Sequence, residues 1–254
     1  MNRAYDSFIT ERKIIGEGAM SKVYYWNDYA YKCYNNDYSQ TLIDYEYEIQ
    51  KKICKSKLNV SKYYKTNFPR TVKMSFINGK TTSSMFNVYG KEKVLDDFIS
   101  YFEEVHKVKD LKLDQLADFL CKQIDTAPAT KVQKKLAKKY IEEIENSVDE
   151  EDVLCHMDYH FLNTMYVNDD IYVVDWIDAR NGKAIYDYAR TYVMIYEYVA
   201  GFKYRYLKKI MLLKNYDKDI FKKAIYVNAI NRIEEHDSKR IRQLIELIET
   251  DKWS

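Results

Sequence analysis

The chain has 254 residues, of which 46% are hydrophobic and 31% charged, enough to bury a substantial core. Its 41 basic and 39 acidic residues leave a net charge of +2, so no overall field attracts it to nucleic acid or to an anionic membrane. Its four cysteines have no paired spacing, and no stretch reads as a leader or a membrane span. We therefore expect a globular protein of the reducing cytoplasm.

The first third of the chain shows mostly strand patterns. Polar and apolar residues alternate from Glu11 to Tyr34 around a turn at Asn27-Asp28, which predicts a β-hairpin. Residues 40–54 switch to helical spacing, and residues 71–80 contain a further strand that ends at Asn78-Gly79. These signals predict a small strand-rich lobe over residues 1–77.

The remainder is mainly helical. Amphipathic patterns over residues 94–108, 113–124 and 132–145 predict three helices, the last two separated by Pro128. The segments TMYV and IYVV then flank a turn at residues 168–170, and helical patterns resume near residue 185. We expect a larger lobe over residues 78–254 that carries one hairpin.

The stretch LCHMDYHFLN at residues 154–163 concentrates polar groups that can carry chemistry. On a helix, His156 and His160 would share one face as in zinc proteases, but the segment lies between an apolar run and a strand, and Met157 stands where those enzymes have glutamate. Loop histidines that only satisfy local hydrogen bonds are a second reading. Phosphoryl transfer is a third reading, and it explains more of the sequence.

Phosphoryl transfer requires an aspartate that orients a hydroxyl group, an asparagine five residues later that holds magnesium, and a second metal-binding aspartate after a hairpin. Asp158, Asn163 and Asp175 match this spacing. Here the chain resembles the aminoglycoside phosphotransferase and choline kinase family, relatives of the protein kinases. Their H-G-D-x-x-x-x-N and I-D-W motifs appear as HMDYHFLN and VDWIDA, giving a catalytic loop at 156–163 and a metal loop at 175–178.

This resemblance implies an α+β, bilobal protein-kinase-like fold, with a small β-rich first lobe containing one helix and a larger, mainly helical second lobe containing the catalytic-loop hairpin. It also implies that ATP or GTP and Mg²⁺ bind. The segment IIGEGAMSKV matches the glycine-rich phosphate loop G-x-G-x-x-G-x-V with four residues: Gly16, Gly18, Ser21 and Val23.

Other first-lobe residues follow from the same resemblance. Lys32 stands where kinases keep the lysine that contacts the α- and β-phosphates, and it needs a glutamate partner on the next helix. Glu46 falls within the apolar stripe of that helix, whereas Glu48 shares its side with lysines, so we predict Glu46 as the partner. The family's adenine hinge corresponds to backbone groups near Phe76 and Ile77, with Val23 and Ala30 covering the adenine ring.

Two further positions concern the catalytic loop. Asp187 resembles the family's aspartate that accepts backbone N–H groups of this loop, and a helix N-terminal aspartate is compatible with the same role. Met157 replaces the usual glycine of the loop, Ser21 replaces the third glycine of the phosphate loop, and Trp176 stands where protein kinases have phenylalanine.

The acceptor is expected to be a small molecule. Only 12 positions separate Asp175 from Asp187, too few for the activation segment on which protein kinases bind a peptide. Helices over 94–146 and after 186 would bind a hydroxylated compound instead. A nucleotide-binding pseudokinase without turnover is the alternative, although none of the four expected functional residues is missing. A nucleic-acid module, suggested by lysines at 131–139, is disfavoured because glutamates continue the same helix.

The family resemblance and the acidic residues both bear on the acceptor's charge. The family implies cationic acceptors such as aminoglycosides or choline, and for aminoglycosides it raises the question of antibiotic resistance. Acidic residues gather before the catalytic loop and in the C-terminal helices, where they would form an acidic wall or simply solvated helix ends: Glu142, Glu143, Glu145, Asp149, Glu150, Glu151, Asp152, Glu234, Glu235 and Asp237.

Overall fold

The computed structural model describes residues 3–253, and the chain divides into two compact units. The first comprises Met1–Val88 and Leu162–Ile177, and the second comprises Tyr89–Phe161 and Asp178–Ser254. This division differs from the expected boundary after residue 77. The hairpin of β8 and β9 joins the first unit because β8 pairs with β6, just beyond the expected boundary.

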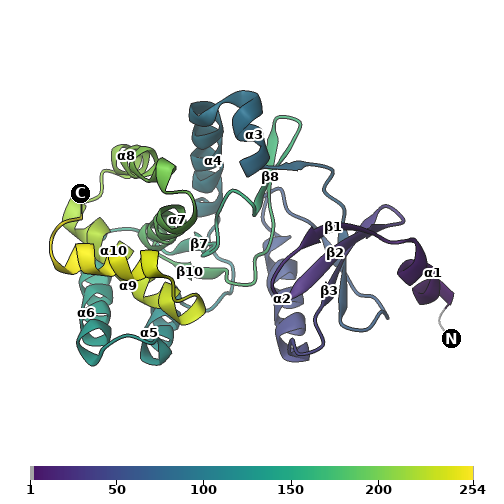
Figure 1. Ribbon diagram of the computed structural model, residues 1–254, viewed down its shortest axis with the longest axis horizontal. Helices are drawn as coiled ribbons and strands as arrows, with labels where there is room; N and C mark the ends of the chain where they lie inside the picture. The colour runs from purple at the N-terminus through teal and green to yellow at the C-terminus, as the bar shows by residue number, and fades with distance from the viewer. Residues whose placement is uncertain (1–2, 254) are drawn as a thin grey trace. The chain divides into compact units, whose positions relative to one another are not determined.

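The first unit is built on a five-stranded antiparallel sheet in the order β1-β2-β3-β5-β4 and a three-stranded sheet in the order β6-β8-β9 (Figure 1). The strands are β1 Lys13–Glu17, β2 Ser21–Trp26, β3 Tyr29–Tyr34, β4 Tyr63–Tyr64, β5 Thr71–Ser75, β6 Lys80–Thr81, β8 Thr164–Val167 and β9 Asp170–Val173. Its helices are α1 Arg3–Glu11, α2 Gln40–Ile53 and α3 Thr82–Tyr89, whose last residue is assigned to the second unit.

The predicted hairpin between β2 and β3 is confirmed. Asn27 and Asp28 both have positive φ, 45° and 64°, the left-handed pair that a tight turn between twisted strands requires. The register places Val23 opposite Lys32 and Tyr25 opposite Ala30. Because alternate residues of a strand share a face, Val23, Ala30 and Lys32 lie on the same face of the sheet.

Two helices cover opposite faces of this sheet, as Figure 1 shows. The face that carries Lys32 packs against α2 through a cluster that includes Tyr34, Ile43 and Val72. On the other face Phe8 of α1 is fully buried among aromatic rings, with centroids 4.9 Å from Tyr31 and 5.0 Å from Phe68. The sequence did not predict α1, in which Phe8 is the one fully buried anchor.

The second unit is mainly helical, with one two-stranded sheet formed by β7 and β10. Thr130 and Gln133 form a reciprocal capping box that begins α6, and Asp217 caps the start of α9. The elements are α4 Lys91–His106, α5 Leu116–Thr126, α6 Lys131–Ser147, β7 Val153–Cys155, β10 Arg180–Gly182, α7 Ala184–Tyr198, η1 Ala200–Phe202, α8 Lys203–Lys214, α9 Lys218–Glu235 and α10 Lys239–Glu249.

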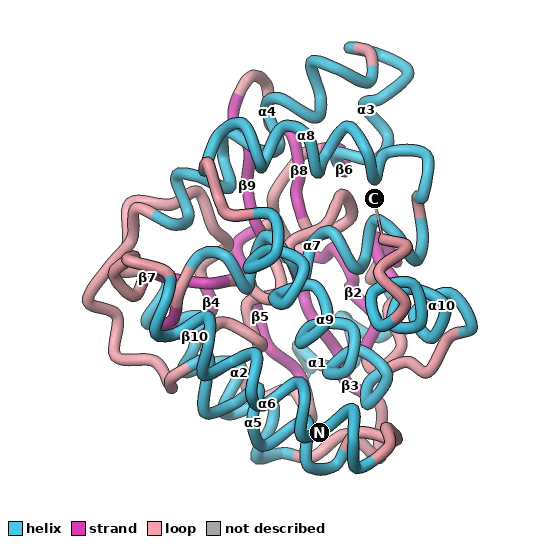
Figure 2. The backbone as a smooth tube through the Cα atoms, turned by 90° about the vertical axis from the view of Figure 1, so that its left-hand side faces the viewer, coloured by secondary structure: helices cyan, strands magenta, loops and turns pink. Residues whose placement is uncertain are grey.

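Helix α7 lies in the interior of the second unit, where α8, α9 and α10 pack against it (Figure 2). Every residue from Ala184 to Glu197 is buried. A helix that is apolar on nearly all sides needs such an environment, and AIYDYARTYVMIYEY has that character. The few polar residues of α7 are therefore held in fixed positions, which matters for the loop that precedes β8.

Two general expectations concern membrane spans and disulfides. Within residues 3–253 no helix combines the length and the apolar character needed to cross a membrane. All four cysteines are free thiols, as their irregular spacing predicts.

Candidate active site

The predicted lysine–glutamate pair forms in the first unit. Lys32 Nζ lies 2.8 Å from Glu46 Oε1 and 3.0 Å from Asp175 Oδ1, so one ammonium group contacts two carboxylates. Burial lowers the pKa of Lys32, but the negative charges of Asp175 and Glu46 outweigh burial and raise it above its ordinary value. Lys32 therefore carries a fixed positive charge at every physiological pH.

Glu46 is the partner that the helix pattern predicts. Its side chain is 2% exposed and also accepts a hydrogen bond of 2.9 Å from Tyr63 Oη, whereas Glu48 is exposed and pairs with Lys51. At the start of the helix the buried residue is Ile43, whereas Leu42, expected in the apolar stripe, is 44% exposed; Ile49 and Ile53 are buried as that stripe predicts. Burial, followed by the negative charge of Glu46, raises the pKa of Tyr63 well above its ordinary value.

The glycine-rich segment connects β1 and β2. Gly18 N donates to Ser21 O at 2.9 Å, and the strand pairing is irregular between Ile14 and Gly16. A Cβ added at Gly16 or Gly18 would come no closer than 3.6 Å to any protein atom outside the neighbouring residues. The fold therefore does not require glycine at either position, and the space that a side chain would occupy is available to a ligand.

Four residues are expected to contact adenine. Val23 and Ala30 share the face of Lys32, and Ala30 is 5% exposed. Phe76 follows the end of β5, is 37% exposed, and packs its ring 4.7 Å from Tyr25. Ile77 O accepts a hydrogen bond from Gly79 N at 3.0 Å.

The two expected metal ligands lie in the same unit as Lys32. Val174 N donates to Asn163 O at 2.9 Å, which fixes the segment before Asp175 beside Asn163. Asp175 has φ of 65° and a side chain that is 40% exposed, so its carboxylate retains room for a ligand besides Lys32. Carboxylate and amide oxygens are the donors that Mg²⁺ prefers, and these residues fit that ion.

The predicted catalytic aspartate belongs to the second unit. Asp158 N donates to His156 Nδ1 at 3.1 Å, and Asp158 Oδ2 lies 3.4 Å from His160 Nε2. Burial raises the pKa of Asp158, but the hydrogen bond and charge of His160 and the charges of His156 and Arg190 outweigh burial and lower it. Asp158 is therefore ionised at neutral pH and can accept a hydrogen bond from a hydroxyl group.

Side chains of helix α7 bond to backbone groups of the catalytic loop. Asp187 accepts N–H groups from His156 at 2.6 Å and from Met157 at 2.8 Å, as expected. Arg190 Nε donates to Met157 O at 3.2 Å, and Thr191 Oγ1 donates to Tyr159 O at 2.8 Å. Because α7 is buried along its length, these contacts fix the loop to the core of the unit.

Met157 adopts φ of 64°, a left-handed conformation that favours glycine. The loop therefore keeps the conformation that glycine would allow in the resembled family, and the side chain of Met157 makes that conformation less favourable by about 1–2 kcal/mol. The side chain of Met157 is 3% exposed, so burial offsets part of that cost. The hydrogen bonds from Met157 N to Asp187 and from Arg190 to Met157 O hold this strained residue in place.

Asp178 is a site candidate whose role sequence reasoning did not assign, although VDWIDA displays it three positions after Asp175. Burial, followed by the negative charges of Asp158 and Glu235, raises the pKa of Asp178 to about 7, against the lowering effect of Arg190 and Arg180. Glu235 in turn forms ion pairs with Arg190 and with Arg232, the latter at 2.8 Å. Asp158, Asp178 and Glu235 thus form an acidic group in the second unit.

The zinc reading fails on local structure. Residues 156–160 are not helical, so His156 and His160 do not share a helix face. Within residues 3–253 the group with metal-ligating geometry is His106, Cys155 and Asp187, which contains neither of them.

Four residues of the expected acidic wall are engaged elsewhere. Glu143 pairs with Lys223 at 2.9 Å, Glu151 pairs with Lys109, and Asp237 pairs with Arg242 at 2.6 Å. Glu150 accepts a hydrogen bond from Tyr216 Oη at 2.6 Å. The structure therefore supports the interpretation of these four residues as charged helix ends. Glu235 is the member of the expected wall whose charge acts on Asp178.

The family model described as the phosphotransferase enzyme family matches residues 15–210. The chain belongs to this family. The match spans the glycine-rich segment, Lys32, the catalytic loop and Asp187 of this phosphotransferase. No curated protein sequence matches the chain.

Solved structures confirm the fold. A thermostable mutant of aminoglycoside phosphotransferase APH(4)-Ia, in ternary complex with AMP-PNP and hygromycin B, has a TM-score of 0.72 and 12% identity, with 100% of both chains covered. Amicoumacin kinase hAmiN, in complex with AMP-PNP, Ca²⁺ and Ami, has a TM-score of 0.64 and 14% identity over 95% of this chain and 89% of that one. The streptomycin–ATP–APH(2")-IIa complex has a TM-score of 0.59 and 15% identity, with 98% and 96% covered. The phosphotransferase thus has the kinase-like α+β fold, with a β-rich first unit and a helical second unit.

Proposed function

We propose that this phosphotransferase transfers the γ-phosphoryl group of ATP to a hydroxyl group of a small molecule. The observation that carries the proposal is Lys32 held between Glu46 and Asp175 on the sheet face shared by Val23 and Ala30. A buried lysine with a raised pKa, beside a glycine segment whose open space the fold does not need, suits the charge and shape of a nucleotide polyphosphate.

In this proposal the first unit binds the nucleotide. Lys32 contacts the α- and β-phosphates, the backbone at Gly16, Gly18 and Ser21 approaches the phosphate oxygens, and the backbone of Phe76 and Ile77 bonds adenine. Asn163 and Asp175 hold Mg²⁺. When bound, Mg²⁺ would neutralise the charge of the phosphates during transfer.

The second unit supplies the acceptor chemistry. Asp158 accepts a hydrogen bond from the acceptor hydroxyl and aims its oxygen at the γ-phosphorus. The new O–P bond forms as the bond to the bridging oxygen of the nucleoside diphosphate breaks, and the hydroxyl proton leaves toward Asp158. A carboxylate with a lowered pKa is a weak base, which fits a loose transition state in which orientation matters more than early proton removal.

A small acceptor fits this chain better than a peptide. The interval from Asp175 to Asp187 is occupied by β10 and the start of α7, and no long activation segment intervenes. We propose further that the acceptor is cationic, such as an aminoglycoside or another amino alcohol. The acidic group of Asp158, Asp178 and Glu235 supports this, since an ammonium group would relieve their mutual repulsion.

An acceptor screen tests the proposal. Nucleotide consumption is measured with ATP or GTP and Mg²⁺ across aminoglycosides, choline and ethanolamine, sugars, homoserine and macrolides, with Lys32→Met as the control for contaminating kinases. Turnover of cationic acceptors by the wild type alone is the expected result. An antibiotic that is phosphorylated would then be tested for resistance in cells that express the chain.

Two other outcomes are informative. Turnover of neutral or anionic acceptors alone would contradict the cationic class while retaining the kinase. ATP binding without any turnover would favour the alternative, a nucleotide-binding pseudokinase.

A further inference from the structure

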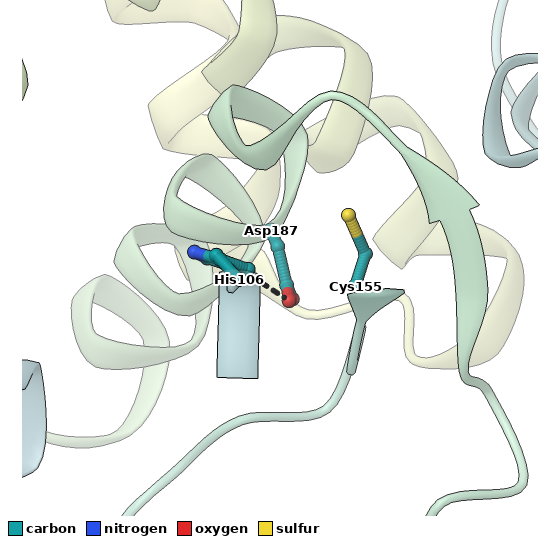
Figure 3. A group of neighbouring side chains, drawn as sticks. All are labelled: His106, Cys155 and Asp187. Carbon is teal, nitrogen blue, oxygen red and sulfur yellow. Dashed lines mark hydrogen bonds and ion pairs between the residues drawn. The ribbon is translucent and has the colours of Figure 1, made fainter. Parts of the chain in front are cut away.

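A buried histidine contacts the aspartate that holds the catalytic loop. His106 is the last residue of α4, is 7% exposed, and lies with Nε2 3.1 Å from Asp187 Oδ2. Its ring is enclosed by aromatic side chains, with centroids 4.5 Å from Phe102 and 4.6 Å from Tyr188. Figure 3 shows the interaction as the dashed line between His106 and Asp187, with Cys155 nearby.

The hydrogen-bond partners determine which ring nitrogen of His106 carries the proton. An ionised carboxylate only accepts, and Asp187 already accepts two backbone N–H groups of the catalytic loop. His106 must therefore donate from Nε2. Its Nδ1 is buried without a hydrogen-bond partner among the described residues, which suits a neutral ring whose Nδ1 is a bare acceptor, because an unpaired buried N–H would cost more.

A metal ion is the competing explanation, since ligand atoms of His106, Cys155 and Asp187 lie within 4.8 Å of one another. The thiol argues against it. Cys155 Sγ contacts two backbone carbonyl oxygens, Gly182 O at 3.5 Å and Lys183 O at 3.7 Å, to which it can donate only as a thiol. Burial, followed by the charge of Asp187, raises the pKa of Cys155 well above its ordinary value, so the thiolate that a metal requires is disfavoured.

We propose that His106 is a positioning residue for phosphoryl transfer. By donating to Asp187 it fixes the carboxylate that holds His156 N and Met157 N, and these amides set the place of Asp158. The clamp matters because Met157 is held at positive φ, and a strained residue persists only where its surroundings over-determine it. This inference rests on the proposed role of Asp158.

Three variants separate positioning from packing. His106→Leu removes the donor and keeps an apolar side chain, and His106→Gln keeps an N–H at the end of the side chain. Val105→Ala is the matched control, because Val105 is fully buried on the same turn of α4 and contributes packing only. Each variant is compared by melting temperature, by amide exchange at His156 and Met157, and by kcat and KM with ATP and an acceptor.

The expected result is selective. Where the two variants lower the melting temperature equally, the amides of His156 and Met157 should exchange at least about tenfold faster in His106→Leu than in Val105→Ala, because one charge-assisted hydrogen bond is lost. His106→Leu should also lower kcat about tenfold and leave the KM for ATP unchanged. His106→Gln should recover part of both effects. Exchange is measured without an acceptor, so it gives an answer even if the screen finds no substrate.

Equal exchange in His106→Leu and Val105→Ala would overturn the inference, as would faster exchange with an unchanged kcat on a working acceptor. Stoichiometric zinc in the purified wild type that is lost in His106→Leu would replace it with a metal site.

Discussion

In the first unit one cation holds two carboxylates, whereas in the second unit three N–H donors hold one carboxylate. Lys32 contacts Glu46 and Asp175 through its ammonium group, and Asp175 remains 40% exposed. Asp187 is fully buried and bonded to two backbone amides and His106. The first arrangement can exchange partners when a ligand enters, and the second cannot do so without breaking the core.

The difference separates groups that bind from groups that position. Ion pairs to an exposed carboxylate cost little to rearrange, so Asp175 is available to a metal ion and Lys32 to phosphate. Buried bonds from amides to a carboxylate are costly to lose, so the loop that carries Asp158 keeps its shape whether or not a substrate is bound. Substitutions in the two regions should therefore fail in different ways.

The largest effect is expected at Asp158. Asp158→Ala should lower kcat by about 10²–10⁴-fold, because the group proposed to orient the hydroxyl and accept its proton is lost. Affinity for ATP with Mg²⁺, measured by calorimetry, should stay within about twofold, since the residues proposed to bind it lie in the first unit. Asp152→Ala, an exposed acid before the loop, is the control and should behave as wild type. Loss of ATP binding in Asp158→Ala would contradict this division of roles.

Asp175 should show the opposite pattern. Asp175→Ala should weaken binding of ATP in the presence of Mg²⁺ by on the order of 100-fold, because a charged group proposed to bind the metal is removed. Without Mg²⁺ the affinities of the variant and the wild type should be similar. Asp169→Ala, in the exposed turn between β8 and β9, is the control in the same unit. An equal loss with and without Mg²⁺ would mean that Asp175 acts through Lys32 and not through the metal.

Two glycines, one in each unit, also differ in their surroundings. A Cβ at Gly18 meets no protein atom closer than 3.7 Å, whereas a Cβ at Gly182 would lie 2.6 Å from Leu116 Cβ. Gly18→Ala should leave the melting temperature unchanged and raise the KM for ATP roughly tenfold or more, because an added methyl group fills space kept for the ligand. Gly182→Ala should lower the free energy of unfolding by about 1–3 kcal/mol. An unchanged KM in Gly18→Ala would remove Gly18 from the phosphate site.

The sequence predicted the parts of the site that depend on short spacing. The turn at Asn27-Asp28 sets the β2–β3 register, which places Val23 opposite Lys32. The helical repeat of α2 singled out Glu46 over Glu48, even though Ile43 and not Leu42 is buried at its start, because a charged residue within a buried stripe needs a partner.

Residues that act through tertiary contacts were harder to predict. His106 and Asp187 are separated by 81 positions, and no local pattern joins them. The pairing of β10 with β7 joins two three-residue strands that carry almost no alternation signal. The acidic wall was predicted from clustering along the chain, but lysines distant in sequence pair with some of its members: Lys223 with Glu143 and Lys109 with Glu151.

The smallest expected effect concerns Asp178, whose carboxyl group has a pKa of about 7 in the folded chain against an ordinary 3.8. The folded state then holds a proton that the unfolded state releases, so this group stabilises the fold at low pH and loses that contribution as pH rises from about 4 through about 7. Each unit of pKa shift corresponds to about 1.4 kcal/mol, and water at this half-buried site reduces the effect, so the free energy of unfolding should fall by about 1–2 kcal/mol across the window.

Asp178→Asn tests this contribution because it keeps the shape of the side chain and cannot ionise. Urea unfolding of both proteins near pH 5 and pH 8 should show a smaller decrease in stability for the variant, and equal decreases would refute the raised pKa. The same ionisation should affect the acceptor. A cationic acceptor binds the ionised form, so its KM should fall as pH rises through about 7 in the wild type and stay flat in Asp178→Asn, because only the wild type gains a carboxylate there. A KM that falls equally in both proteins would assign cation recognition to Glu235 or Asp158 instead.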